Sequence, residues 1–119
     1  MTEPDIIDRV AFNNLLDMLG GDTSFLSEMI DEFLNDTPTL LASMRQALTA
    51  NDIVVLRRSA HTLKSNSANF GAMTLSARCK ELEELSRAGT LDDAPTLVRQ
   101  IEAEYTKVKS ALQAMRPEA

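Results

Sequence analysis

The chain contains a single histidine, His61, among its 119 residues. Imidazole is the side chain whose unperturbed pKa lies near neutrality, and its neutral form offers a nitrogen that can act as a nucleophile or shuttle a proton. If the chain does chemistry near neutral pH, His61 is therefore the residue expected to carry it. The alternative is an ordinary histidine on a solvated helix face.

Helical geometry predicts where His61 points. The helix that contains it carries Leu56, Ala60 and Leu63 on its apolar stripe. At about 100° per residue, His61 lies roughly 120° from the centre of that stripe. The spacing predicts a solvent-facing imidazole and excludes a histidine buried in the core.

The neighbours of His61 suit a phosphoryl group. They lie three, four or seven residues away on the helix surface and comprise Val54, Arg57, Arg58, Lys64, Ser65 and Ala68. The cations can reach a group placed on the imidazole, and the short side chains leave room for a bulky partner. We expect Lys64 to act as a charge partner, since phosphoryl transfer needs positioning and charge compensation above all. Val54 adds an exposed apolar residue for docking.

Other chemistries find little support in the sequence. Gly20, Gly21, Gly71 and Gly89 are too scattered to form a nucleotide-binding loop, so a phosphoryl group has to arrive on another protein. One histidine, one cysteine and scattered carboxylates make a transition-metal site unexpected. Cys79 falls at a core-type position and is predicted to be an inert packing residue.

The charge distribution indicates an acidic partner. The net charge of -6 argues against nucleic-acid binding, which needs a basic face. Between residues 53 and 80, however, five basic residues occur without a single Asp or Glu. This stretch surrounds His61 and predicts a local positive potential, with a chance bare patch as the alternative.

Nearly every segment has helical periodicity. A short helix is expected over residues 7–19, with Val10, Leu15 and Leu19 facing the rest of the molecule. A longer one begins at a cap among Asp22, Thr23 and Ser24 and runs to about residue 48, kinked at Pro38. The central helix spans about 51–70, the next ends at Ala88-Gly89, and the last begins after a cap at Asp92 or Asp93.

Short connections make successive helices antiparallel neighbours. The expected architecture is therefore an all-α, up-down-up-down four-helix bundle with an additional short N-terminal helix. We expect one domain over residues 1–119, with its core at about 22–115 and a frayed tail at 116–119. The sequence has no membrane-spanning run or signal peptide, which predicts a cytoplasmic protein, and a closed bundle predicts a monomer.

The segment AHTLK at 60–64, followed by small residues and by ANFGA at 68–72, resembles the histidine-containing phosphotransfer (HPt) domain. Leu75, Cys79 and Leu82-Glu83 also fit the next helix of that family. The resemblance covers the chain in helix order, while the specific motif is confined to about a dozen residues. Ser65 stands where the family often has glycine, so its role is open, although it is still small enough for docking.

The resemblance implies a phosphoprotein of two-component signal transduction. His61 would accept a phosphoryl group from the aspartate of one response-regulator receiver domain and pass it to another, in a phosphorelay that begins at a hybrid sensor histidine kinase. Lys64 would steady the phosphoryl group, and the receiver would supply Mg²⁺, so that this chain binds no cofactor or metal. The chain would be a carrier rather than a kinase, with no membrane or nucleic-acid contact. Ser65, Ala68, Arg57, Arg58 and Val54 would support docking.

Three alternatives remain at this point. The phosphoacceptor domain of a chemotaxis kinase shares the bundle and differs mainly in its attached domains. The dimerisation domain of a sensor kinase normally has an acidic residue after its histidine and a proline soon after, whereas Thr62 follows here. A non-catalytic helical adaptor would bind a partner without using His61.

Overall fold

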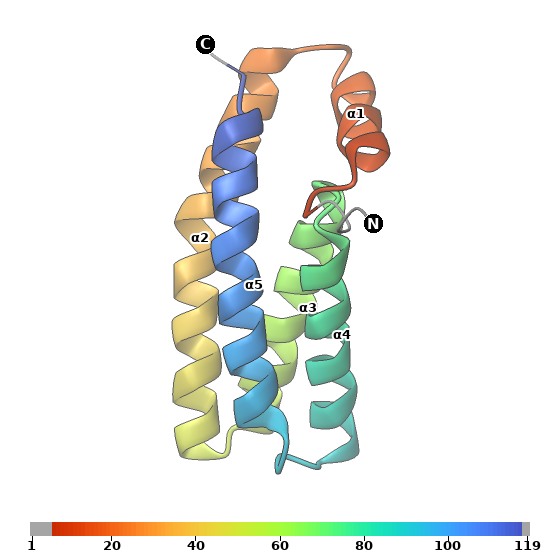
Figure 1. The fold of residues 1–119 in the computed structure, drawn as a ribbon. Coiled ribbons are helices and arrows are strands. Elements are labelled where there is room, and N and C mark those ends of the chain that lie inside the picture. The colour runs from red at the N-terminus through yellow and green to blue at the C-terminus, as the bar shows by residue number, and fades with distance from the viewer. Residues whose placement is uncertain (1–5, 118–119) are drawn as a thin grey trace.

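The computed structural model describes residues 6–117, and over that range its regular secondary structure is all helical. Its helices are α1 (Arg9–Met18), α2 (Thr23–Ala50), α3 (Ile53–Asn69), α4 (Met73–Ala88) and α5 (Ala94–Met115). Figure 1 shows α2 to α5 running alternately up and down as an elongated bundle, with α1 beside the end formed by the α3–α4 turn. The predicted four-helix bundle with an extra N-terminal helix is confirmed.

Aspartate side chains cap the starts of α2 and α3. The Asp22 carboxylate accepts the Phe25 N–H at 3.0 Å and caps α2, and Asp52 caps α3 by accepting the Val55 N–H at 3.1 Å. Asn51 ends α2 in the left-handed conformation, with φ of 53°. At α5 the predicted N-cap position is confirmed at Asp93, but the Asp93 side chain makes no capping hydrogen bond.

The core consists of the aliphatic stripes that periodicity predicts. Leu56, Ala60, Leu63 and Ser67 of α3 are buried together with their counterparts on α2, α4 and α5. This stripe fixes the rotation of α3 about its own axis. The face that carries His61 is therefore held towards solvent by the burial of the opposite face.

Helix α2 is continuous through Pro38. Proline lacks the N–H that would bond to the carbonyl four residues earlier, which leaves the Leu34 carbonyl without its helical donor. The Tyr105 hydroxyl of α5 donates to that carbonyl at 3.3 Å. A side chain from the neighbouring helix therefore satisfies the group that Pro38 leaves free.

The N-terminal helix packs partly as predicted: Leu15 and Leu19 lie against the core, but Val10 does not. Val10 is 70% exposed, whereas Ile7 and Phe12 are buried. The Asp8 N–H donates to the Gly71 carbonyl at 2.8 Å, which ties the start of α1 to the α3–α4 turn. Gly71 has φ of +82°, and a Cβ there would lie 2.6 Å from the Asp8 carbonyl oxygen. Glycine permits both the turn and the close approach of the two backbones.

The predicted frayed tail is wrong for residues 116 and 117. The Arg116 guanidinium donates two hydrogen bonds of 2.8 Å to the Asp31 carboxylate, which lowers the pKa of Asp31. The Ser27 hydroxyl donates to the Pro117 carbonyl at 2.8 Å. These contacts join the end of α5 to α2, and residues 118–119 of the predicted tail lie outside the described range. Among the described helices, none combines the length and apolarity that a membrane crossing requires.

Candidate functional site

His61 lies in the middle of α3 and its side chain is 58% exposed. The preceding residue, Ala60, and the residue two later, Leu63, are fully buried. The orientation predicted from helical geometry is therefore confirmed. The exposed imidazole is accessible to a partner protein, which a histidine buried in the core would not be.

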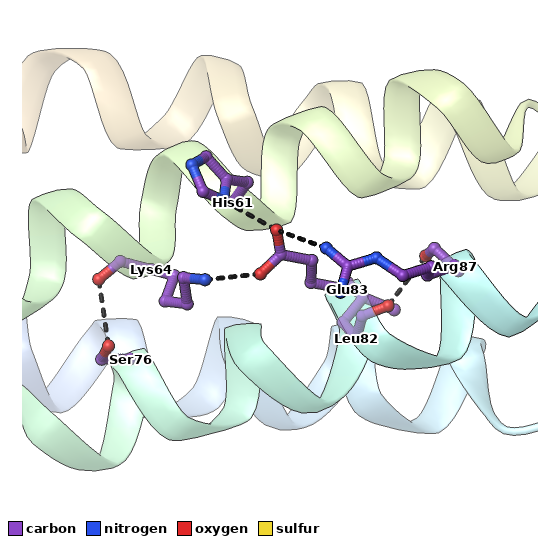
Figure 2. A network of polar contacts seen from close by, with 7 residues as sticks. His61, Lys64, Ser76, Leu82, Glu83 and Arg87 are labelled. Atoms are coloured by element: carbon purple, nitrogen blue, oxygen red, sulfur yellow. Dashed lines mark hydrogen bonds and ion pairs between the residues drawn. The ribbon is translucent and has the colours of Figure 1, made fainter.

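A carboxylate from the next helix holds the imidazole. Glu83 of α4 places Oε2 2.7 Å from His61 Nδ1 and Oε1 2.6 Å from Lys64 Nζ. The Arg87 guanidinium lies 3.7 Å from Oε2. Figure 2 shows these side chains converging from α3 and α4, with Glu83 at the centre. Because Glu83 is only 6% exposed, these groups replace most of the water that its charge would otherwise need.

The environment of Glu83 determines the tautomer of His61. The hydrogen bond from Lys64 is the largest effect and lowers the pKa of the Glu83 carboxyl, aided by the bond to His61 and opposed by burial. Glu83 is thus ionised at neutral pH and can only accept hydrogen bonds. Nδ1 of the neutral imidazole must then carry the proton, which leaves the lone pair on Nε2. In Figure 2 the other ring nitrogen points away from Glu83, and the side chain as a whole is mostly exposed.

Lys64 is engaged differently from the expectation. Instead of a free ammonium near the imidazole, it forms a short ion pair with Glu83, and its side chain is 28% exposed. The Ser76 hydroxyl donates to the Lys64 carbonyl at 3.0 Å and so links α4 to the same turn of α3. The role of Lys64 at a phosphoryl group remains a prediction, and it now involves competition with Glu83.

The structure brings some of the expected docking residues together. A shallow depression of about 210 Å³ is lined by Val54, Arg57, Arg58, His61, Glu83 and Arg87. Val54 is 53% exposed, as predicted. Ser65 is exposed and Ala68 half-buried on the following turns of α3, outside this depression.

The basic stretch is not a single patch around His61. Arg78, which the sequence places in that stretch, lies in the groove between α4 and α5 and forms an ion pair of 3.1 Å with Glu81. Glu83 adds a negative charge that follows the acid-free stretch by only three residues. The positive surface around His61 is thus smaller than predicted and has a carboxylate within it.

Sequence reasoning did not assign Glu83 or Arg87 to the site. One available signal was the position of Glu83 directly after Leu82, beside a stripe of buried residues that also includes Ser86. A carboxylate next to such a stripe is seldom buried without a cationic partner. The two residues lie 22 and 26 positions after His61, so helical spacing alone cannot connect them to it.

The fold and the site together indicate a class of protein: antiparallel helical bundles that present a histidine to solvent. In this chain a buried carboxylate and neighbouring cations support that histidine. The sequence model of the Hpt domain family matches residues 28–111 of this chain. The chain therefore belongs to the Hpt domain family.

Individual relatives agree with this assignment. The crystal structure of histidine-containing phosphotransfer protein B from Pseudomonas aeruginosa is similar with a TM-score of 0.87 and 33% identity, covering 96% of both chains. Histidine-containing phosphotransfer protein 2 of Arabidopsis thaliana is 29% identical over 98 residues, which are 80% of this chain and 63% of the plant protein. This chain thus spans under two thirds of that relative. The maize protein ZmHP2 shares the fold, with a TM-score of 0.81 at 22% identity, over 92% of this chain and 82% of its own.

Proposed function

We propose that this chain is a phosphorelay intermediate, in which His61 accepts a phosphoryl group from a receiver-domain aspartate and passes it to the aspartate of another response regulator. The observation that carries the proposal is the exposed imidazole whose Nδ1 is held by the ionised, buried Glu83. Membership of the Hpt domain family and the likeness to a phosphotransfer protein at 33% identity support it.

The proposed step is an in-line displacement at phosphorus. The Nε2 lone pair of His61 attacks the aspartyl phosphate, the N–P bond forms, and the P–O bond to the aspartate breaks as its carboxylate leaves. Nδ1 keeps its proton, so the phosphorylated ring gains positive charge. The Glu83 carboxylate, 2.7 Å from Nδ1, is placed to offset that charge. Transfer to the next receiver is the reverse of this step.

The cations around His61 support docking of an acidic partner. Arg57 and Arg58 share the depression with the imidazole, and Arg87 lines it from α4. Their positive potential would attract the acidic pocket of a receiver and offset the charge of the phosphoryl group. Lys64 would move part of its interaction from Glu83 to the phosphoryl oxygens.

Mg²⁺ belongs to the receiver in this proposal. The ion prefers oxygen ligands, several of them water or carboxylate. The Glu83 carboxylate beside His61 is already engaged by His61 and Lys64. This chain would then act as a carrier in the cytoplasm, as a monomer, downstream of a hybrid sensor histidine kinase and without kinase activity of its own.

The test is phosphotransfer from a phosphorylated receiver domain to the wild type and to His61→Gln. We expect label on the wild type alone, stable in alkali and lost in acid, as a phosphoramidate is. Circular dichroism should show the same helix content for both, since the substituted side chain lies outside the core. Label that persists in His61→Gln would refute His61 as the acceptor. A wild type that takes no label from any of a panel of receivers would favour a non-catalytic adaptor.

A further inference from the structure

A second surface feature lies on α2 and α3, away from the Glu83 network. It is a cleft of about 170 Å³ between the two helices. Its apolar lining consists of Met29, Phe33 and Phe70, and the two aromatic rings pack against each other at 5.2 Å between centroids. Phe33 and Phe70 are buried, so the base of the cleft is part of the rigid core.

Polar groups complete the lining of this cleft. Glu32 and Asp36 contribute carboxylates from α2, and Asn66 and Asn69 contribute amides from α3. Within residues 6–117 neither carboxylate forms an ion pair, although the adjacent Asp31 is held by Arg116. Two negative charges thus lie beside an apolar, aromatic base without a cationic partner among the described residues.

We propose that this cleft receives one lysine or arginine side chain of the docking receiver domain, and this rests on the function proposed above. A long basic side chain has an apolar stem and a charged head, which match an apolar base and a carboxylate rim. Aromatic rings further favour a cation at close range. The amides of Asn66 and Asn69 offer oxygen acceptors for the remaining N–H groups.

The position of the cleft links it to the phosphoacceptor. His61, Ser65 and Asn69 follow one another at intervals of four residues and form one row along α3. Eight residues of helix correspond to about 12 Å, and a protein partner that covers about 800 Å² would extend over both features. Ser65 is exposed and short, so the row between them is open. The proposal therefore accounts for the small side chain at position 65.

The resulting docking surface carries opposite charges at its two ends. Arg57 and Arg58 precede His61 on α3. Glu32 and Asp36, on α2, lie beside the C-terminal turns of α3. A partner that satisfies both ends must present acidic groups near its own phosphoryl site and a basic side chain further along. Such a pattern fixes the orientation of the partner and disfavours receivers that lack the basic group.

The test compares two double variants in transfer from a phosphorylated receiver that the wild type accepts. Glu32→Gln with Asp36→Asn removes the charges of the cleft. Glu84→Gln with Asp92→Asn removes the same charges from exposed positions outside the cleft. We expect the cleft variant to lose about tenfold in kcat/KM and to respond less steeply to salt, since a charge-assisted contact is removed. The second variant should retain the wild-type rate.

The sign of the effect makes the test decisive. A receiver whose contact surface is only acidic would associate equally fast or faster once Glu32 and Asp36 are neutralised, because repulsion falls. An unchanged or raised kcat/KM in the cleft variant would therefore overturn the proposal while leaving the phosphorelay role intact. A wild type that accepts no phosphoryl group from any receiver would instead overturn both. Thermal unfolding of both variants checks the fold, and the exposure of all four residues predicts intact bundles.

Discussion

Replacing Glu83 by glutamine tests the central inference about the site, because it removes the charge while keeping the size of the side chain. The carboxylate accepts from His61 Nδ1 at 2.7 Å and from Lys64 Nζ at 2.6 Å. A glutamine has one acceptor oxygen and one NH₂ donor, so it cannot accept from both groups in the same way. We expect both the stability of the bundle and the state of the imidazole to change.

The expected loss in the free energy of unfolding follows from these two hydrogen bonds and from the exposure of their donors. A hydrogen bond to a charged group contributes about 1.5–3 kcal/mol when its partners are buried. His61 is 58% exposed and Lys64 is 28% exposed, so water replaces part of what each donor loses. The net loss in the free energy of unfolding should be about 2 kcal/mol at neutral pH, which corresponds to a fall in Tm of about 8 °C for a domain of this size.

The pH dependence of this loss has a definite sign. Lys64 and His61 lower the pKa of the Glu83 carboxyl below its ordinary value of 4.5. A group whose pKa is depressed by folding stabilises the native state above its unfolded pKa, and this contribution disappears as pH falls through the folded pKa. The difference in stability between wild type and Glu83→Gln should therefore be constant near neutrality and shrink below about pH 4. Urea unfolding at a series of pH values measures it.

The functional assay is phosphotransfer together with nitrogen NMR of the imidazole. In the wild type the proton should reside on Nδ1, and in Glu83→Gln the two tautomers should mix because the amide can donate as well as accept. We expect transfer to slow by about tenfold, equivalent to about 1.4 kcal/mol of lost positioning and charge stabilisation. Glu84→Gln on the same helix is the control. Wild-type stability across the pH series, with an unchanged tautomer and rate, would refute the reasoning.

Lys64→Ala should slow transfer several-fold without abolishing it and raise the pKa of Glu83, measurable by carboxyl NMR; an unchanged rate would leave Lys64 a structural partner of Glu83 only. Gly71→Ala should destabilise the bundle by more than Gly89→Ala, which should cost about 1 kcal/mol, as measured by urea unfolding. Both glycines have positive φ, but only at Gly71 does the new Cβ meet a backbone atom, the Asp8 carbonyl oxygen at 2.6 Å; equal losses would contradict that contact. Ser67→Ala should leave stability unchanged or raise it by up to about 1 kcal/mol, because the buried Ser67 hydroxyl has no hydrogen-bond partner within residues 6–117; a clear loss in urea unfolding would indicate a bond that the structure does not contain.

The parts of the fold that periodicity predicts are those held by long apolar stripes. Leu56, Ala60 and Leu63 determine both the existence of α3 and its rotation, so the exposure of His61 follows from the sequence. Helix α1 has only ten residues and buries Phe12 alone, which gives a weak pattern. Its packing depends on the contact between Asp8 and Gly71, two residues far apart in sequence. No local pattern encodes that contact, and periodicity alone therefore predicts the wrong face for Val10.

The residues of the site likewise fall into those that the sequence can predict and those that it cannot. Residues within two turns of His61 share its helix, so their proximity is a matter of spacing. Glu83 reaches the imidazole only because α3 and α4 pack in a particular register, which depends on how whole side chains interlock. The sequence shows that a carboxylate stands beside a buried stripe, but it does not show which cations of the neighbouring helix lie opposite.

The register of α3 and α4 also changes how the positive charge near His61 is interpreted. The basic stretch, taken from the sequence alone, predicts cations that are free to bind a phosphoryl group. In the structure, however, Lys64 Nζ already forms an ion pair with Glu83 at 2.6 Å. The ion pair keeps Glu83 ionised, and the ionised Glu83 in turn holds the proton on Nδ1 and leaves Nε2 free. In the function proposed above, Lys64 would thus prepare the nucleophile before any phosphoryl group arrives. If the ring were phosphorylated, Nδ1 would carry more positive charge and Glu83 would interact more strongly with the ring, so that Lys64 would be easier to release towards the phosphoryl oxygens.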